Sequence, residues 1–348
     1  MNCILRRPVD NKSILAMEQL QWLLHTVAAM KINLFEHPRE DHPVLAIGLL
    51  MIAVFALACQ DSLVKLMSSY TSFWQFQTLR SIGNVSFTLM LAAMSGGLTL
   101  IRPVNVRPVY LRAMFLTVCM FCFFASAPFL SIAQMAAGLY TYPIFVTLLA
   151  GPILGEQVGP WRISAILLGG SGAAIVISPW DSGFSPVQVL PLIAGFFYAC
   201  NILTLRRGCR KESPLALAFA VGMVFLVSGI AGITLLTLFP LSEAIREATP
   251  FVAIGWPELT LLVFGFAVFA SVLNLTGNIC LSRAYQTADA SLLAPLDFIY
   301  LLFIAIWGKI LFDQWPTGQA LTGMTLIAAA GVLIAWREQV VKRRSIGN

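Results

Sequence analysis

The sequence predicts an all-α polytopic membrane protein of ten transmembrane helices, arranged as two inverted five-helix repeats. Three observations lead to this fold class. Hydrophobic residues make up 58% of the 348-residue chain and charged residues only 11%, which is too few charges to cover a water-exposed surface. Ten apolar runs approach the roughly 20 residues that cross the hydrocarbon core of a bilayer. All but four of the 22 Lys and Arg residues fall in alternate gaps between these runs or in the two tails.

The predicted spans are bounded by helix-breaking residues. Pairs such as Gly96–Gly97 and Gly159–Pro160, and single prolines such as Pro240, stand between apolar runs, because neither residue type continues a helix readily. The spans read from this pattern are 44–66, 73–95, 109–130, 134–154, 162–178, 187–205, 215–239, 258–281, 288–311 and 319–336.

The distribution of Lys and Arg predicts the orientation. With the amino terminus in the cytoplasm, the cation-rich gaps all lie inside, as the positive-inside rule requires. The exceptions are Lys65, Arg80, Arg246 and Lys309. We therefore expect a multi-pass protein of the inner membrane, embedded in the lipid bilayer, with both termini in the cytoplasm.

Four regions follow along the chain: a cytoplasmic extension at 1–43, a first repeat at 44–178, a second repeat at 187–338, and a basic cytoplasmic tail at 339–348. Spans four and nine share a pattern. Each carries a proline, Pro143 or Pro295, within an apolar run and ends at an acid, Glu156 or Asp313. Because five spans is an odd number, the second repeat is inverted relative to the first, and such repeats place a substrate site near the midplane.

Ionisable side chains inside the spans need a partner or a water-filled cavity, because each costs about 2.5–3.5 kcal/mol at the centre of a span. Asp297 follows Pro295 by two residues and has no basic residue three or four positions away. It is the best candidate for a cation-binding or proton-accepting carboxylate. A hydrogen-bonded packing acid is the alternative.

A group of charges near the predicted outer interface has two interpretations. Asp61 and Lys65 lie one helical turn apart and can neutralise each other, and Arg80 can join them. This group is either a structural charge network or a contact for the substrate. Lys309 and Asp313 have the same four-residue spacing and are expected to pair.

Tyrosines stand near both prolines. Tyr140 and Tyr142 stand just before Pro143 in span four, and Tyr300 lies in span nine. Their rings can stack on a substrate, although tyrosine is also typical of the membrane interface. Asn274 and Asn278 share one face of span eight, where they either line a cavity or join helices.

Several segments together resemble the EamA-type ten-helix carriers of the drug/metabolite transporter superfamily. They are Asp61 with Lys65, Gln77 with Arg80, Pro143 with ILGE at 153–156, APLDF at 294–298, and the closing LTGMTLIAAAGVLIAWRE. The resemblance covers roughly residues 44–338. It implies a secondary carrier that moves a small metabolite by alternating access, with the site between spans four and nine. Such carriers include exporters of amino acids and drugs and importers of metabolites such as S-adenosylmethionine. The sequence departs from the pattern at Phe312-Asp313-Gln314, where Gly-Glu is common, so Glu156 and Asp313 need not act alike.

The expected partners are therefore a small-molecule substrate and protons, with proton coupling or exchange as the driving process and a monomer or homodimer as the assembly. We expect no enzyme activity, because the chain has no nucleophile motif or metal motif, and its three His precede the first span. No cofactor and no nucleic-acid partner are expected, since the cations are dispersed at the ends of apolar runs. A membrane scaffold or a channel is a less favoured alternative.

Overall fold

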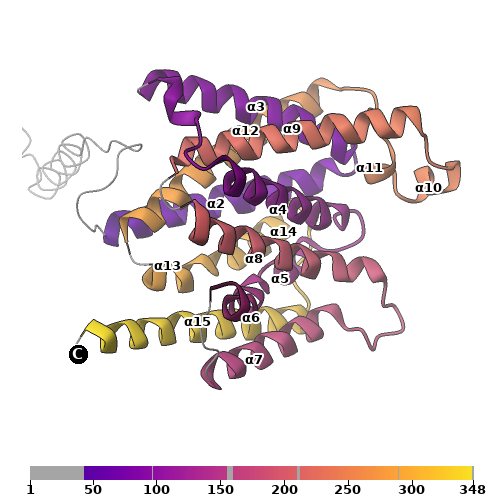
Figure 1. The fold of residues 1–348 in the computed structure, drawn as a ribbon. Coiled ribbons are helices and arrows are strands. Elements are labelled where there is room, and N and C mark those ends of the chain that lie inside the picture. Colours follow the sequence, from indigo (N-terminus) through magenta and orange to yellow (C-terminus); the bar gives the residue numbers. More distant parts are fainter. Residues whose placement is uncertain (1–42, 96, 155–159, 210–211, 289, 347–348) are drawn as a thin grey trace, which may run out of the picture. The chain divides into compact units, whose positions relative to one another are not determined.

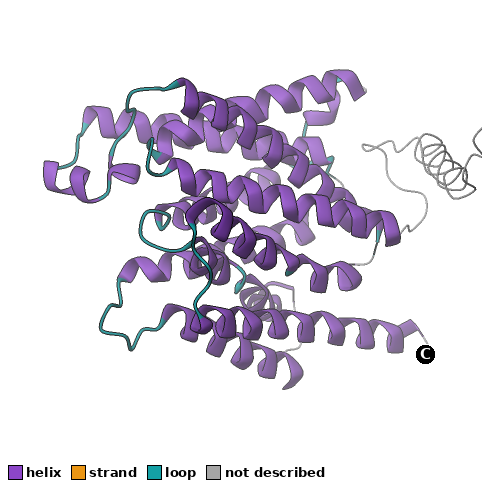
Figure 2. Ribbon diagram, turned by 180° about the vertical axis from the view of Figure 1, so that it is seen from behind, coloured by secondary structure: helices purple, strands orange, loops and turns teal. Residues whose placement is uncertain are grey.

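The computed structural model describes residues 43–95, 97–154, 160–209, 212–288 and 290–346. The chain divides into Met1–His37 and Pro38–Asn348, and all described residues belong to the second unit. These residues form helices and loops without a strand (Figure 2), so the predicted all-α class is confirmed. The predicted N-terminal extension lies outside the described residues except for Pro43.

The helices, labelled as in Figure 1, follow one another with short connections. They are α2 (Pro43–Met67), α3 (Phe73–Ser95), η1 (Leu98–Ile101), α4 (Val106–Ala125), α5 (Ile132–Leu139), α6 (Tyr142–Leu154), α7 (Pro160–Ile177), η2 (Pro186–Val189), α8 (Leu190–Gly208), α9 (Pro214–Leu238), α10 (Glu243–Ala248), α11 (Pro250–Ala253), α12 (Leu261–Thr287), α13 (Ala290–Asp297), α14 (Ile299–Phe312) and α15 (Gly318–Ile346). The last helix continues eight residues beyond the predicted repeat boundary at 338.

Eight helices in the described part of the chain are long and apolar enough to cross a membrane. Their bounds are Pro43–Met67, Val106–Ala125, Ile132–Leu149, Pro186–Gly208, Pro214–Leu238, Leu261–Tyr285, Pro295–Phe312 and Gly318–Trp336. The protein is therefore a multi-pass helical membrane protein. The apolar part of α7, Ile163–Ile177, is shorter, and the count of ten spans stays a prediction.

Helix α3 is long enough to span a membrane but too polar to be counted among the eight. Its polar side chains point inward: Gln75 and Arg80 are buried, whereas Ile82 and Met94 are exposed. This is the reverse of a soluble amphipathic helix, and it is what a bilayer requires of a span that carries a buried charge. Helix α3 therefore brings polar groups to the interior of the bundle.

Spans four and nine are each broken in two. Helix α5 begins at a capping box in which Ser131 and Gln134 satisfy each other's backbone N–H groups, and it ends before Tyr140. Pro143 lies in the first turn of α6, where its missing N–H costs little. Pro295 lies inside α13, which ends two residues later. Both prolines thus stand beside a break, as the sequence pattern indicates.

Most close helix contacts join the first half of the chain to the second. Helix α2 packs on α12, α3 on α9, α4 on α8, and α7 on α15 (Figure 1). The approach is close where glycine meets backbone. A Cβ on Gly195 of α8 would lie 2.7 Å from Thr141 Oγ1 and 3.0 Å from the carbonyl oxygen of Gly138, so only glycine lets α8 reach the break between α5 and α6.

Candidate functional site

The two helix breaks meet in the interior of the bundle. Asp297 is the last residue of α13, and its Oδ2 accepts a hydrogen bond of 3.0 Å from the hydroxyl of Tyr142, the first residue of α6. The Tyr140 hydroxyl donates to the backbone carbonyl oxygen of Asp297 at 3.3 Å. The structure therefore brings together three of the predicted site residues, and it does so between the two halves of the chain.

A second acid lies close by on α2. Both oxygens of Asp61 are occupied: Oδ2 accepts from the Tyr300 hydroxyl at 2.6 Å, and Oδ1 accepts from Gln60 Nε2 at 3.0 Å. The rings of Tyr140 and Tyr300 stack with centroids 4.9 Å apart and planes 13° apart. This stacked pair connects the surroundings of Asp61 to those of Asp297.

The two acids differ in how fully they are satisfied. Asp61 is 7% exposed, and the buried guanidinium of Arg80 acts on it electrostatically. Asp297 is half-buried, accepts a side-chain hydrogen bond on one oxygen, and makes no ion pair in the described part of the chain. A carboxylate has about four acceptor positions. Asp297 therefore keeps the larger capacity to bind a proton or a cation.

Asn274 belongs to a hydrogen-bonded chain that joins three helices. Asn84 Nδ2 donates to Asn274 Oδ1 at 3.3 Å, and Asn274 Nδ2 donates to Gln60 Oε1 at 2.8 Å. Asn278 Nδ2 donates to the carbonyl oxygen of Asn274 at 2.8 Å. The bonds of Asn274 favour its helix-joining interpretation, whereas the bond of Asn278 stays within α12 and favours neither interpretation.

The predicted pairing of Lys65 with Asp61 is wrong. Lys65 Nζ instead donates to the carbonyl oxygens of Ala127 and Leu130, each at 2.6 Å. These carbonyls belong to the turn after α4, where the chain has left the helix and backbone oxygens lack helical partners. Arg80 stays near Asp61 and acts on it electrostatically, while its guanidinium donates a hydrogen bond to Gln77 Oε1 at 2.6 Å.

The predicted pairing of Lys309 with Asp313 is confirmed, with 2.5 Å between Nζ and Oδ1. Both side chains are exposed at the end of α14, outside the interior cluster, and the hydrogen bond from Lys309 lowers the pKa of Asp313. An exposed pair of this kind contributes little to stability. Glu156, which the sequence pattern matches with Asp313, lies outside the described residues.

Two further tyrosines complete the cluster around Asp297, and the residue patterns did not single them out as site residues. The rings of Tyr142 and Tyr198 meet edge to face with centroids 4.9 Å apart. Tyr285 interacts electrostatically with both Asp297 and Tyr198. Five of the seven tyrosines of the chain thus gather here, which we call the tyrosine cluster: Tyr140, Tyr142, Tyr198, Tyr285 and Tyr300. The signal was available, because Tyr198 and Tyr285 each lie in an apolar run.

Comparison with known proteins supports the family resemblance. Residues 44–178 match the model of the EamA-like transporter family. The chain is similar to the riboflavin transporter of Vibrio cholerae serotype O1, with 29% identity over 61% of this chain and 65% of the relative. It is similar to the pseudopaline exporter CntI of Pseudomonas aeruginosa strain UCBPP-PA14, with 23% identity over 82% of this chain and 94% of the relative.

Residues 44–178 form an EamA-like transporter domain, the type found in the drug/metabolite transporter superfamily. The resemblance that the sequence motifs indicated is therefore confirmed. A third relative is the S-adenosylmethionine uptake transporter of Rickettsia bellii, with 24% identity over 60% of this chain and 65% of the relative. The matches to the riboflavin transporters of Vibrio cholerae and Rhizobium johnstonii span 65% and 64% of those proteins.

A hydrogen-bonded segment lies beside the turn between α2 and α3. The segment 250–257, which contains α11, is fastened to the start of α3 by three side chains. Ser72 Oγ donates to the carbonyl oxygen of Gly255 at 2.8 Å, Trp74 Nε1 to that of Val252 at 2.8 Å, and Gln75 Nε2 to that of Pro257 at 2.7 Å. We call residues 250–257 the strap.

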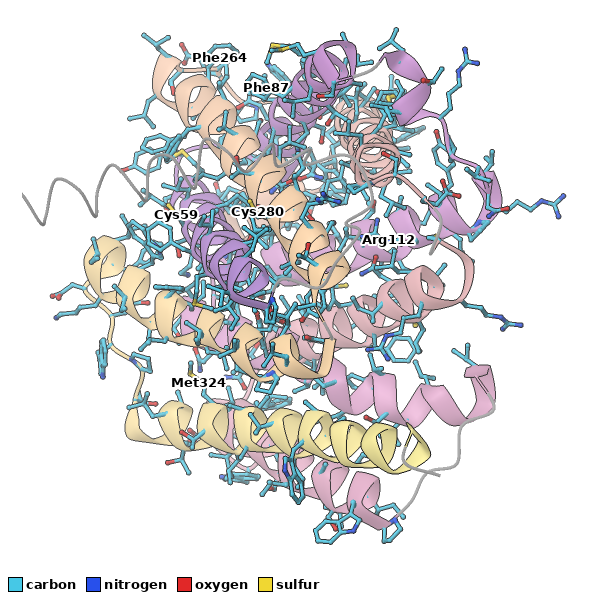
Figure 3. All side chains as sticks on the ribbon, turned by 90° about the vertical axis from the view of Figure 1, so that its left-hand side faces the viewer. Cys59, Phe87, Arg112, Phe264, Cys280 and Met324 are labelled. Atoms are coloured by element: carbon cyan, nitrogen blue, oxygen red, sulfur yellow. The ribbon has the colours of Figure 1, made fainter. Side chains whose placement is uncertain are left out.

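The tyrosine cluster is partly accessible. Tyr142, Tyr198, Tyr285 and Asp297 are half-buried, whereas Tyr140 and Tyr300 are buried. Arg112, on the side of α4 that faces α8, acts electrostatically on Tyr198 (Figure 3). The accessible part of the cluster offers aromatic rings, hydroxyl groups and one carboxylate.

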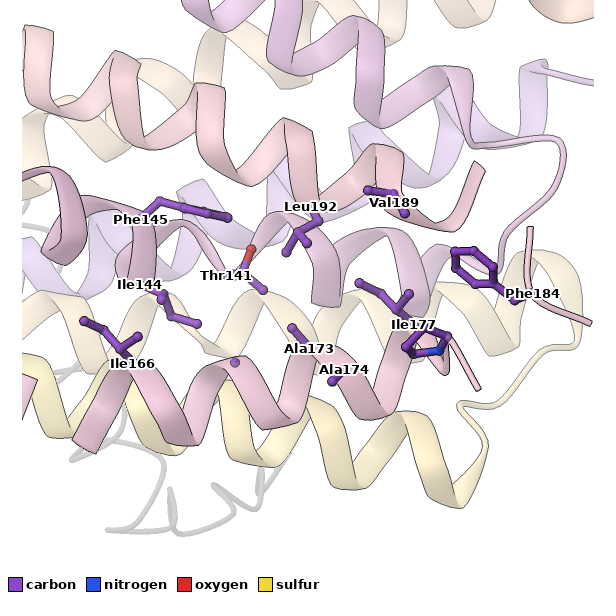
Figure 4. Close-up of a pocket in the computed structure, with 12 residues that line it drawn as sticks. Thr141, Ile144, Phe145, Ile166, Ala173, Ala174, Ile177, Phe184, Val189 and Leu192 are labelled. Atoms are coloured by element: carbon purple, nitrogen blue, oxygen red, sulfur yellow. The ribbon is translucent and has the colours of Figure 1, made fainter. Parts of the chain in front are cut away.

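Two hollows lie beside the cluster rather than at it. One, of about 410 Å³, is bounded by α6, α7 and α8 and is lined mainly by apolar side chains, with Thr141 of the helix break facing into it (Figure 4). The other, of about 440 Å³, lies between α4, the end of α6 and α8. Among the described residues, no group of three or more His, Cys, Asp or Glu is placed to hold a metal ion.

Proposed function

We propose that this protein is a secondary active transporter that moves a small organic metabolite across the inner membrane by alternating access. The observation that carries the proposal is the hydrogen bond between Tyr142 and Asp297, which joins the broken span of one half to the broken span of the other. Broken helices that meet near the midplane are typical of secondary carriers, because their free ends and side chains can bind an ion or a solute.

Helix packing supports the two inverted repeats, 44–178 and 187–338. If the repeats exchange places, the packing of the first span on the eighth becomes that of the sixth on the third. Both contacts are extensive, as α2 on α12 and α4 on α8. The pairs α3–α9 and α7–α15 map onto themselves under the same exchange. Rocking of one repeat against the other would open the cluster to alternate sides.

Asp297 is the proposed coupling residue. A carboxylate with one oxygen free of side-chain partners can take up a proton or a cationic group, and its half-buried position leaves it reachable. Asp61 is the proposed structural acid, since Tyr300, Gln60 and Arg80 already satisfy it. Protonation of Asp297 would change its bond to Tyr142 and so link the proton to the contact between the two halves.

The orientation follows from the cations. The carboxyl end of α8 carries Arg206 and Arg207, which the positive-inside rule places in the cytoplasm. Tyr285 lies two residues before the end of α12, on the same side, so the accessible part of the tyrosine cluster opens toward the cytoplasm. The strap and the Lys65 contacts then close the outer end, and both termini are cytoplasmic.

The names of the relatives suggest which solutes to test first as cargo. Riboflavin, pseudopaline and S-adenosylmethionine are small organic molecules, and their transporters include both uptake and export proteins. Amino acids are added as export cargoes. We expect one of these to show saturable counterflow in proteoliposomes, because a carrier exchanges labelled for unlabelled cargo. A conductance without counterflow would instead favour a channel.

The coupling role is tested in proteoliposomes that hold the full chain. A trapped pH dye reports proton movement, and labelled cargo reports accumulation. An imposed pH gradient is expected to drive accumulation of the active cargo, and Asp297→Asn should abolish that accumulation. The matched control is Asp313→Asn, which removes an exposed acid from the end of α14. Gradient-driven accumulation that persists in Asp297→Asn would contradict the assignment.

A further inference from the structure

We propose that Tyr142, Tyr198 and Tyr285 form a cage with Asp297 for an organic cation, so that the cargo carries an ammonium, sulfonium or similar group. The inference rests on the proposed function and deepens it by naming the chemical class of the cargo. It separates cationic solutes from neutral ones of the same shape.

The geometry of the cage comes from three different helices and one helix break. Tyr142 begins α6, Tyr198 lies within α8, and Tyr285 lies near the end of α12. Tyr142 and Tyr198 are perpendicular, at 79°, with centroids 4.9 Å apart. Tyr142 also donates to Asp297, so the carboxylate lies at the hydroxyl end of that ring. An aromatic ring is negative on its face and positive at its edge, so each ring can attract a cation only through a face, and the Asp297 carboxylate adds a full negative charge next to them.

None of the cation–π contacts found in the described residues involves Tyr142 or Tyr198. In the part of the chain that the structure describes, the cation–π contacts are those of Lys65 with Phe312 and of Arg80 with Phe124 and Phe225. Tyr140 and Tyr300, in contrast, already cover each other. The remaining tyrosines of the cluster are the three that are half-buried, and they are thus the ones whose faces a solute can reach.

Asp297 supplies the attraction that the surroundings lack. The cations that act on the cage are guanidinium groups, Arg112 on Tyr198 and Arg206 on Tyr285. Without the Asp297 charge, the cage would therefore be a poor place for a second cation. This arrangement makes a specific expectation: removal of the carboxylate should weaken binding of a cation but not that of a neutral molecule of equal size.

Two probes of matched shape test the cage. The probes are 3-hydroxyphenyltrimethylammonium and 3-tert-butylphenol, which differ in having a quaternary nitrogen or a quaternary carbon. Binding is measured by equilibrium dialysis against the full chain in lipid nanodiscs, with empty nanodiscs to subtract partition into lipid. We expect the cation to bind about tenfold more tightly than the neutral probe, the range in which desolvated cation–π contacts act.

Three substitutions locate the effect. Asp297→Asn should weaken cation binding about tenfold and leave the neutral probe unchanged. Tyr198→Phe keeps the ring and should retain cation binding, whereas Tyr198→Leu should lose it. Tyr70→Leu, an exposed tyrosine outside the cluster, is the matched control. Circular dichroism and thermal unfolding in the same nanodiscs confirm that each variant is folded.

Equal affinity for the two probes, or unchanged cation binding in both Asp297→Asn and Tyr198→Leu, would overturn the cage. Such a result would leave proton-linked transport of a neutral cargo intact, so it is distinguishable from failure of the proposed function. Conversely, selective cation binding without counterflow of any cargo would support the cage and contradict the carrier.

Discussion

Tyr142 and Asp297 are 155 residues apart in the chain and meet at 3.0 Å. Each occupies the end of a half-helix, Tyr142 at the beginning of α6 and Asp297 at the end of α13. The bond therefore joins the two halves at the point where both lose regular helical hydrogen bonding. A change of charge on Asp297 would act directly on Tyr142, which belongs to the other half.

The Tyr142–Asp297 bond should be measurable as a coupling energy. We expect a double-mutant cycle of Tyr142→Phe and Asp297→Asn, followed by chemical unfolding in detergent, to give about 1.5–3 kcal/mol, as for a hydrogen bond to a charged group. The control cycle pairs Asp297→Asn with Tyr70→Phe, which should give no coupling. Additive effects of Tyr142→Phe and Asp297→Asn would show that the bond is not formed in the folded protein.

Asp61→Asn should reduce stability rather than selectivity. The substitution leaves the buried guanidinium of Arg80 without its nearby acid and weakens the bond from Tyr300. Loss of one member of a buried charged pair costs about 3–5 kcal/mol. We expect a large drop in thermal stability in detergent, and partial rescue by the double variant Asp61→Asn with Arg80→Gln. A wild-type unfolding temperature in Asp61→Asn would contradict the structural role of this acid.

Lys65→Met should loosen the outer end of the bundle. The ammonium group holds two carbonyl oxygens after α4, and methionine fills similar space without donating to them. We expect faster labelling of a cysteine introduced at Ser126, the buried first residue of this turn, by a membrane-impermeant maleimide. The matched control is Lys309→Met, whose ammonium is exposed and whose loss should change labelling little. Identical labelling of both variants would argue against a closure role for Lys65.

Gly195→Ala should push α8 away from the break between α5 and α6. The added methyl would lie 2.7 Å from Thr141 Oγ1 and 3.0 Å from a backbone carbonyl, neither of which can move without the break. Overpacking of this kind costs about 1–3 kcal/mol. Gly170→Ala, in the interior of α7 with open space around it, should instead be neutral or mildly stabilising. Thermal unfolding of the two variants distinguishes the outcomes, and a stable Gly195→Ala would contradict the close approach.

Much of the fold was predictable because a bilayer limits the choices. Apolar runs must become helices, since unsatisfied backbone groups are too costly in lipid, and the prolines at 143 and 295 marked the two breaks. Polar residues within apolar runs were expected to face the interior, and the structure brings three of them, Asp297, Tyr140 and Tyr142, together. The sequence also paired Lys309 with Asp313, because helical spacing alone determines that contact.

The same logic failed where distant backbone was the partner. Lys65 lies one turn from Asp61, yet it donates to the carbonyl oxygens of Ala127 and Leu130. A pattern of side chains in the sequence does not show which backbone carbonyls lack a helical partner. Tyr198 and Tyr285 were missed as site residues for a related reason. Each is a single polar tip in its own span, and only packing of α8 and α12 beside the breaks brings them to Asp297.

The sequence by itself determined that this protein is helical and membrane-embedded, and it placed an acid and tyrosines at two proline-marked breaks. Hydrophobicity and local backbone chemistry are properties of short segments, so a segment suffices to show them. Only the tertiary structure decided that Asp61 accepts side-chain hydrogen bonds on both oxygens and Asp297 on one. That distinction depends on contacts between residues such as Asp61 and Tyr300, 239 positions apart, which close packing of helices from both halves brings together.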